Sequence, residues 1–246
     1  MKTSRRNFLK TASFVGAGAF TGGLISGCAQ GKPQSNLHEI LDTVKKSHSQ
    51  RFNMSGYAAP PIPVVRVGFI GLGDRGSGAV QRLSYIEGVE IKALGDLREV
   101  AVKGSQRYLA RIGRPEAQEF YGDENIWKKL VELPDIDLIY ICTPWVWHAQ
   151  MANYAMENGK HVVCEVPIVR TIDEAWMLVE TSERMKKHCM MLENCCYDFF
   201  ELLTLNMARQ GMFGDIIHGE GAYIHNLLEM KFKKPDDSRQ TDGAYT

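Results

Sequence analysis

A glycine-rich turn between an apolar run and a predicted helix constrains the fold of this chain more than any other feature. A run rich in β-branched residues, typical of a buried strand, spans residues 64–70. It leads directly into a G-x-G-x-x-G turn formed by Gly71, Gly73 and Gly76, and the spacing of apolar residues predicts a helix over residues 76–86. A strand, this turn and a helix in that order predict the first βα unit of a dinucleotide-binding fold.

Each glycine of the turn has a predicted role in holding a dinucleotide. Gly71 allows the tight turn, Gly73 lets the backbone approach the pyrophosphate, and Gly76 lets helix and strand pack closely. Asp96 ends a second predicted strand, 20 residues after Gly76, where a carboxylate binds the ribose hydroxyls of NAD. Arg98 beside it leaves NADP open as an alternative cofactor. The alternative interpretation is a glycine turn and a capping aspartate in an α/β protein that binds no nucleotide.

The rest of the chain continues the alternation of strands and helices. Further strands are predicted over residues 89–95, 137–142, 161–165 and 189–192, and helices over residues 99–112, 147–158, 171–187 and 197–209. This alternation predicts an α/β fold in which residues 64–194 form a Rossmann domain with a doubly wound parallel sheet. A last strand is predicted over residues 216–228, at the start of a C-terminal α/β open-sheet domain that occupies residues 195–246.

The first 28 residues form a predicted targeting segment rather than part of the fold. Arg5 and Arg6 precede Phe8-Leu9-Lys10 and an apolar stretch, which resembles a twin-arginine export signal. The stretch ends in Ile25-Ser26-Gly27-Cys28, which resembles a lipobox with Cys28 as the lipidated residue. We therefore expect a periplasmic or cell-envelope lipoprotein whose only membrane contact is this anchor. Residues 29–63 are expected to form a lead-in helix and a proline-rich linker.

Composition excludes several classes of function. Lys+Arg and Asp+Glu are equal at 29 each, so no positive field is predicted to attract nucleic acid. Beyond the targeting segment no apolar run is long enough to span a bilayer. The cysteines show no paired zinc spacing, so no metal site is predicted, and most thiols are expected to be free.

Candidate ligand contacts gather where the predicted strands end. Ligands of open α/β sheets bind beyond the carboxyl ends of the strands. The segments expected there contain Trp145, His148, Glu165, Asn194 and Tyr197. An aromatic ring can cover the nicotinamide, and an amide can bind its carboxamide. The alternative for each is a helix cap or a core residue; His148, for example, falls in the first turn of its predicted helix.

The order of these motifs resembles a known family. The turn at residues 71–76, Asp96, Cys142-Thr143-Pro144 and Cys164-Glu165-Val166-Pro167 resemble the glucose–fructose oxidoreductase and inositol dehydrogenase family. Its members pair a Rossmann domain with a C-terminal α/β domain that holds an open sheet. Their usual signature is Glu-Lys-Pro, so Val166 replaces a lysine that is often used in sugar oxidation.

Longer strings indicate one branch of that family. Residues 145–148, 164–167, 191–197 and 219–225 resemble glycoside hydrolase family 109, whose members are NAD-dependent α-N-acetylgalactosaminidases and often exported lipoproteins. The resemblance covers residues 1–228 and implies a glycan substrate with terminal N-acetylgalactosamine. It places NAD contacts at Asp74, Arg75, Asp96, Trp145, His148, Glu165, Val166 and Asn194, and a sugar contact at Tyr223.

The resemblance also implies a redox-neutral glycosidase cycle. The sugar is oxidised at C3 by hydride transfer to NAD⁺, loses its C2 proton, eliminates the aglycone, adds water and is reduced again; such enzymes are exceptions to the two-carboxylate schemes. Tyr223 and His225 are the candidates for proton transfer, since alternate residues of a strand share a face. The alternative interpretation is a half-buried aromatic pair.

Two other functions remain open. One is a periplasmic NAD(P)-dependent sugar oxidoreductase with tightly held cofactor, against which Val166 counts. The other is a non-catalytic, truncated nucleotide-binding fragment, since a single strand of the second domain is predicted and residues 230–239 are highly charged. For these reasons we expect the 246-residue chain to bind NAD without cleaving glycosides. A homo-oligomer is possible.

Overall fold

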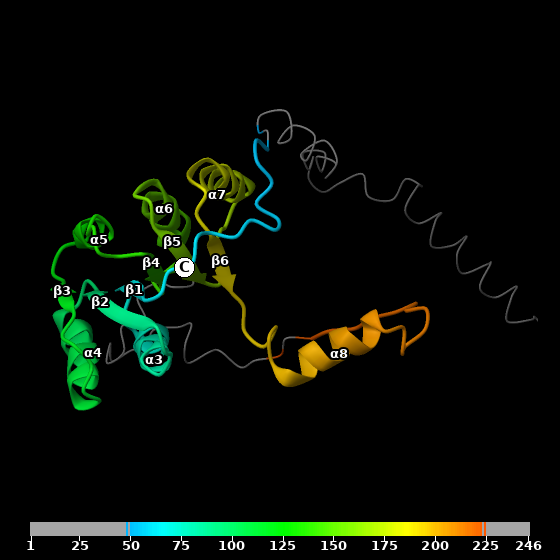
Figure 1. Ribbon diagram of the computed structural model, residues 1–246, viewed down its shortest axis with the longest axis horizontal. Coiled ribbons are helices and arrows are strands. Elements are labelled where there is room, and N and C mark those ends of the chain that lie inside the picture. Colours follow the sequence, from blue (N-terminus) through cyan, green and yellow to red (C-terminus); the bar gives the residue numbers. More distant parts are fainter. Residues whose placement is uncertain (1–47, 49, 223, 225–246) are drawn as a thin grey trace, which may run out of the picture. The chain divides into compact units, whose positions relative to one another are not determined.

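The part of the chain that positions the site is a single parallel sheet. The computed structural model describes residues 48, 50–222 and 224, and within them six parallel strands are ordered β3-β2-β1-β4-β5-β6 (Figure 1). They are β1 (Val65–Ile70), β2 (Val89–Gly95), β3 (Gln118–Phe120), β4 (Leu138–Ile141), β5 (His161–Glu165) and β6 (Cys189–Leu192). This strand order is that of the doubly wound dinucleotide-binding fold, so the predicted Rossmann sheet is confirmed.

Helices cover both faces of the sheet. They are α3 (Asp74–Leu83), α4 (Glu99–Arg111), α5 (Ile126–Val131), α6 (Trp145–Glu157) and α7 (Ile172–Met185), and α8 (Phe199–Arg209) follows in the chain. As Figure 1 shows, α3 and α4 pack on one face, while α5, α6 and α7 pack on the other. The central strands β1 and β4 are largely buried and mostly apolar rather than alternating, whereas β2 carries Glu90 and Lys92.

Two apolar clusters hold the layers together, one on each side of the sheet. Phe69 and Leu94 of the strands pack with Val80 of α3 and Leu109 of α4. On the other side, β-branched residues of β4 pack against α5, α6 and α7. At about 1.5–3 kcal/mol for each fully buried large side chain, these clusters supply the main stabilisation of the sandwich.

The predicted elements agree closely with the structure. The spans of β2, β5 and β6 are confirmed as predicted, and the bounds of the other predicted strands and helices within residues 64–209 lie within three residues of the observed ones. A capping box begins α7: the Thr171 hydroxyl accepts from the Glu174 N–H, and the Glu174 carboxylate accepts from the Thr171 N–H. Two short elements, β3 and α5, were not predicted.

The strand predicted over residues 216–228 is wrong for the residues that the structure describes. Residues 216–222 form neither helix nor strand. A strand needs a neighbour for its N–H and C=O groups, and none of the described strands pairs with this segment. The targeting segment, the lead-in helix, Tyr223 and His225 lie outside the described residues. The five described cysteines are free, as expected: Cys142, Cys164, Cys189, Cys195 and Cys196.

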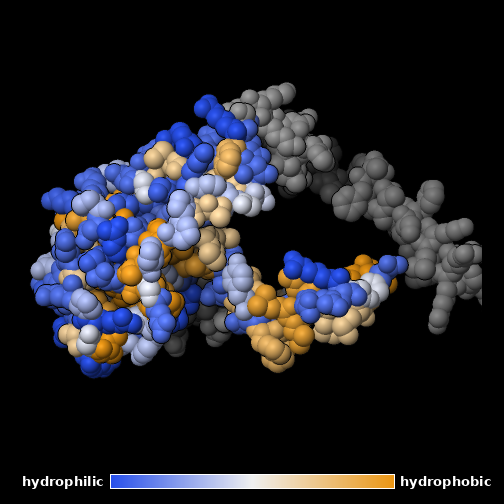
Figure 2. All heavy atoms as spheres, viewed as in Figure 1, coloured by the Kyte–Doolittle hydropathy of each residue, from blue (hydrophilic) through white to orange (hydrophobic). Residues whose placement is uncertain are grey.

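Helix α8 exposes apolar side chains along its length. None of its residues is buried, and Phe199 and Phe200 are among its exposed apolar residues. Figure 2 shows the hydrophobic residues gathered on this helix. Across the described residues, no helix combines the length and the apolar character needed to cross a membrane.

Backbone contacts between the glycine turn and its surroundings fix the start of α3. Gly71 has a φ of +89°, and a Cβ there would lie 2.6 Å from the Cys142 carbonyl. A Cβ on Gly76 would lie 1.9 Å from the Gly71 carbonyl oxygen. Because the opposing atoms are backbone, neither clash can be relieved by a side-chain rotation. These two glycines are therefore required by packing alone.

Replacing Gly76 with alanine is expected to destabilise the fold through that clash. We expect Gly76→Ala to lower the free energy of unfolding by about 1–3 kcal/mol or more, the usual cost of overpacking. Gly104→Ala in α4 is the matched control, because a Cβ there would meet only Arg107, at 4.0 Å. It should stabilise the protein by about 0.5–1 kcal/mol, since alanine favours a helix interior. Urea unfolding of the full chain checks both values, and equal stability of the two variants would contradict the packing role.

Candidate active site

The central glycine of the turn has a different role from its neighbours. Gly73 is the N-cap of α3, and its φ of −69° lies outside the left-handed region that favours glycine. A Cβ at this position would meet only the end of the Arg98 side chain, at the ordinary contact distance of 3.5 Å. Neither backbone strain nor packing within the protein therefore requires glycine here. What the missing Cβ leaves is room for a ligand to approach the backbone, as a pyrophosphate does in this fold.

The N-terminus of α3 supplies the donors for such a ligand. No side chain caps this helix, so the N–H groups of its first turn are not used by a capping residue. They carry the positive end of the helix dipole, which favours phosphate. Asp74 and Arg75, the first two residues of the helix, are both exposed at this end. The cradle fits the pyrophosphate of a dinucleotide.

Asp96 lies beside the turn, where the ribose of the adenosine half is expected. It follows β2, and its side chain is only 9% exposed. One carboxylate oxygen accepts from the Leu72 N–H at 2.7 Å, and the other accepts from the Arg98 N–H at 2.8 Å. The Arg98 Nε lies 3.3 Å from the latter oxygen. A carboxylate oxygen can accept about two hydrogen bonds, so the oxygen that accepts from the Leu72 N–H can also accept from a ribose hydroxyl.

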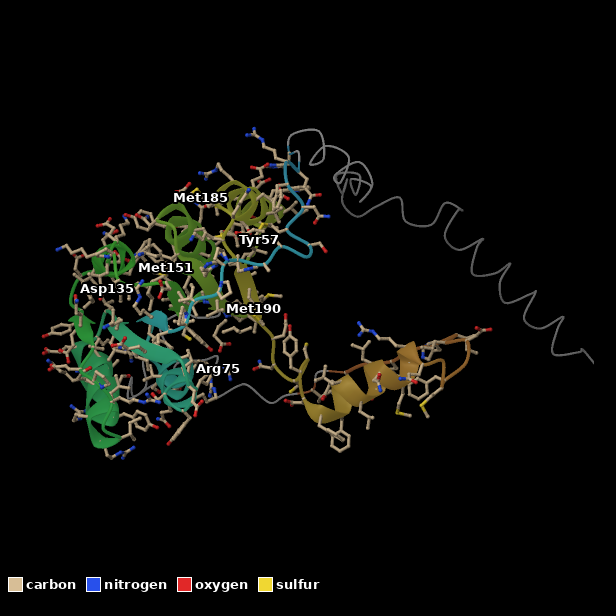
Figure 3. The ribbon with its side chains drawn as sticks, in the orientation of Figure 1. Tyr57, Arg75, Asp135, Met151, Met185 and Met190 are labelled. Carbon is tan, nitrogen blue, oxygen red and sulfur yellow. The ribbon has the colours of Figure 1, made fainter. Side chains whose placement is uncertain are left out.

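Three predicted residues meet at the other side of the site. Figure 3 labels Arg75, which extends from α3 toward the segment after β6. Its Nη2 donates to Glu165 Oε2 at 3.0 Å and to Asn194 Oδ1 at 2.7 Å. The hydrogen bond to Glu165 raises the pKa of the Arg75 guanidinium above its ordinary value. The predicted gathering of Glu165 and Asn194 at this edge is therefore present, and Arg75 joins them.

These three residues line a cleft of about 260 Å³ at the carboxyl ends of β5 and β6. Its lining residues are Arg75, Arg82, Tyr140, Glu165, Leu192, Glu193, Asn194 and Cys195. Burial raises the pKa of the Tyr140 hydroxyl to about 12, and burial also raises the pKa of the nearby Cys142 thiol to about 12. Both groups stay protonated at neutral pH, so neither supplies a base to this edge of the site.

The remaining predicted contacts surround the start of α6. Trp145 is the first residue of that helix and is half-buried. His148 is buried, and its Nδ1 and Nε2 lie 2.8 Å and 2.6 Å from the carbonyl oxygens of Pro167 and Thr143. The ring thus links the ends of β4 and β5, as expected for a packed residue of the first turn. A contact of His148 with NAD stays a prediction.

Val166 follows Glu165 and is half-buried, and the Val166–Pro167 peptide bond is cis. The structure therefore places the predicted cofactor residues at the carboxyl edge of one sheet. Contacts that sequence reasoning missed are the Leu72 and Arg98 N–H groups on Asp96 and the double hydrogen bond of Arg75. The Arg98 N–H contact is a local turn pattern, since an aspartate side chain often accepts from the N–H two residues on. No sequence spacing indicates the contacts of Arg75, whose partners are 90 and 119 residues away.

Replacing Gly73 with alanine should separate binding from stability. The added Cβ meets no crowded protein atom, so the free energy of unfolding should change by less than about 1 kcal/mol. The same Cβ occupies the space of the pyrophosphate, so the affinity for NAD should fall at least tenfold. Calorimetric titration with NAD, alongside urea unfolding, measures both effects. A variant that binds NAD as tightly as the parent chain would contradict the proposed cradle.

Known proteins share both the sequence and the fold of this chain. Residues 65–193 match the family described as oxidoreductase family, NAD-binding Rossmann fold, and residues 197–245 match the glycosyl hydrolase 109 C-terminal domain. Among solved structures, scyllo-inositol dehydrogenase from Lactobacillus casei with bound NAD(H) and scyllo-inositol has the same fold. Its sequence is 21% identical, and the two structures superpose with a TM-score of 0.55. The superposed part covers 62% of this chain and 43% of the dehydrogenase chain.

Curated relatives are much closer in sequence. Glycosyl hydrolase family 109 protein 1 of Bacteroides fragilis is 52% identical over 216 residues, which are 88% of this chain and 45% of the relative. An α-N-acetylgalactosaminidase of the same species is 54% identical over 177 residues, or 72% of this chain and 41% of the relative. The chain thus spans less than half the length of these relatives. With its Rossmann sheet, its NAD-binding turn and these identities, the chain belongs to glycosyl hydrolase family 109.

Proposed function

We propose that a protein that contains this chain and has the length of its relatives removes terminal α-N-acetylgalactosamine from glycans. The reaction depends on NAD. The observation that carries the proposal is the NAD site itself, the Gly73 cradle with Asp96 beside it, in a chain 54% identical to a relative named α-N-acetylgalactosaminidase. A hydrolase has no net redox change, so a built dinucleotide site implies a cofactor that is reduced and reoxidised within one turnover.

The described residues divide the work of holding NAD. The Gly73 backbone and the first turn of α3 bind the pyrophosphate, and Asp96 binds the ribose of the adenosine half. Glu165 and Asn194 face the nicotinamide half, with Trp145, Val166 and His148 as the further contacts that the family resemblance implies. When bound, NAD supplies a reversible hydride acceptor for C3 of the sugar. The protein supplies orientation and proton transfer.

Tyr223 is proposed to contact the sugar, and Tyr223 and His225 to transfer protons at C2 and at the glycosidic oxygen. This assignment is supported by the family resemblance of residues 219–225 alone, since both residues lie outside the described part of the chain. A periplasmic sugar oxidoreductase is the second candidate, and the match of residues 65–193 to an oxidoreductase family favours it. Val166 weighs against it, because an apolar side chain there cannot exchange a proton with a sugar hydroxyl.

A paired assay tests the glycosidase function. A protein of the relatives' length should release p-nitrophenol from p-nitrophenyl α-N-acetylgalactosaminide. This activity should depend on NAD⁺ and should be accompanied by no net formation of NADH. Residues 1–246 alone should bind NAD without turnover, because the described residues after Asn194 supply one helix and no strand to carry a sugar site. Stoichiometric NADH formation would instead identify the oxidoreductase, and full activity of residues 1–246 would show that the remaining length is dispensable.

We also propose that the protein is exported by the twin-arginine pathway and anchored by a lipid on Cys28. Arg5, Arg6 and the segment that ends at Cys28 support this location. A cofactor regenerated in every turnover suits a compartment with little free NAD, and this pathway exports proteins that have already folded.

Replacing the two arginines tests the export route. The Arg5→Lys, Arg6→Lys double variant should stay in the cytoplasm, because paired lysines lack the guanidinium groups that the signal presents. Cell fractionation and immunoblotting measure the distribution. Cys28→Ala is the companion variant, and it should still be exported but be released from the membrane fraction. Unchanged export from a strain without the twin-arginine translocase would refute the route.

A further inference from the structure

One guanidinium nitrogen joins three elements at the nicotinamide side of the site. Nη2 of Arg75, in the first turn of α3, lies 3.0 Å from Glu165 Oε2 at the end of β5 and 2.7 Å from Asn194 Oδ1 just after β6. The Glu165 side chain is 9% exposed, whereas that of Arg75 is 56% exposed. The buried carboxylate therefore anchors the guanidinium, and the guanidinium in turn holds the more exposed amide of Asn194.

This contact decides which end of the Asn194 amide faces the cofactor. A guanidinium only donates hydrogen bonds, so it must bind the amide oxygen. With Oδ1 turned toward Arg75, the NH₂ group is directed away from the guanidinium and toward a ligand, and it can only donate. Without the guanidinium of Arg75, this hydrogen bond would no longer hold the amide oxygen of Asn194 on the side away from the ligand.

The strand order places Asn194 at the nicotinamide half of the dinucleotide. In this fold the pyrophosphate crosses the sheet at β1 and β4, where the strand order reverses. Asp96 follows β2 and binds the adenosine half, so the nicotinamide half extends over the ends of β4, β5 and β6. Asn194 follows the last of these strands. The acceptor on the nicotinamide half that suits an amide donor is the carbonyl oxygen of the carboxamide.

We propose that Arg75 is a positioning residue: it orients the Asn194 amide so that its NH₂ donates to the carboxamide oxygen of NAD. This role differs from the direct NAD contact that the family resemblance implies for Arg75. The inference rests on the NAD-binding assignment of the domain. It requires that Arg75 act through Asn194, and that its effect be confined to the nicotinamide half of the cofactor.

A double-mutant cycle with two ligands tests the proposal on the full chain. Arg75→Met and Asn194→Ala should each weaken NAD binding about five- to tenfold, the range expected for one hydrogen bond, and the double variant should be no weaker than either single variant. ADP-ribose, which lacks the nicotinamide, should bind all three variants as it binds the parent chain. Calorimetry measures each Kd. Arg107→Met, which removes an exposed arginine from α4, is the matched control and should change neither affinity.

The same titrations with NAD and ADP-ribose can also contradict the proposal. If Arg75→Met weakened ADP-ribose as much as NAD, Arg75 would be a phosphate ligand and the proposal would be overturned. Additive losses in the double variant would show that Arg75 does not act through Asn194. Retained ADP-ribose binding also shows that each variant is folded. A parent chain that bound neither ligand would contradict the NAD assignment itself, which is a different failure.

The acetylpyridine analogue of NAD tests the direction of the hydrogen bond. This analogue keeps the carbonyl oxygen and replaces the amide nitrogen with a methyl group. If Asn194 donates to the oxygen, Arg75→Met should weaken the analogue as strongly as it weakens NAD. If the analogue were insensitive to Arg75→Met while NAD was not, Asn194 would instead accept from the carboxamide, and the proposed orientation would be wrong.

Discussion

The close contact of Gly76 with the Gly71 carbonyl oxygen is the constraint on which the site depends. It lets the backbone of α3 press against the turn after β1, and so fixes where that helix begins. Arg75 immediately precedes Gly76, so its side chain leaves the helix from a fixed point beside the turn. Leu72 lies in the same turn and donates to Asp96. One backbone contact therefore fixes the positions of the glycine turn, the Asp96 carboxylate and the Arg75 hydrogen bonds relative to one another.

Two carboxylates at the site are each paired with an arginine. Asp96 is paired with Arg98, and Glu165 with Arg75. Each pair offsets part of the desolvation cost of a largely buried carboxylate. The attraction for the phosphates of a dinucleotide then comes mainly from the backbone of α3, whose N–H groups cannot be neutralised by a change of pH.

The sequence predicted the fold well where the physical signal is local. Apolar runs and the spacing of apolar residues located the long elements, because burial of nearby residues defines them. The three-residue strand β3 and the six-residue helix α5 were missed because elements so short are stabilised by the neighbours they pack on. The same limit applies at the site: Gly71, Gly73, Gly76 and Asp96 follow a local pattern, whereas the hydrogen bonds of Arg75 depend on how distant strands come together.

The hydrogen bond from Leu72 to Asp96 has a consequence for how long the cofactor stays bound. It joins the Asp96 carboxylate, the proposed ribose ligand, to the glycine turn, the proposed phosphate site, without help from the cofactor. Little conformational entropy is then lost when the dinucleotide arrives, and most of the contact energy is retained as affinity. Affinity gained through preorganisation is expressed mainly as slow dissociation. A long residence time is the property required of a nucleotide that is oxidised and reduced in place and does not exchange with its surroundings.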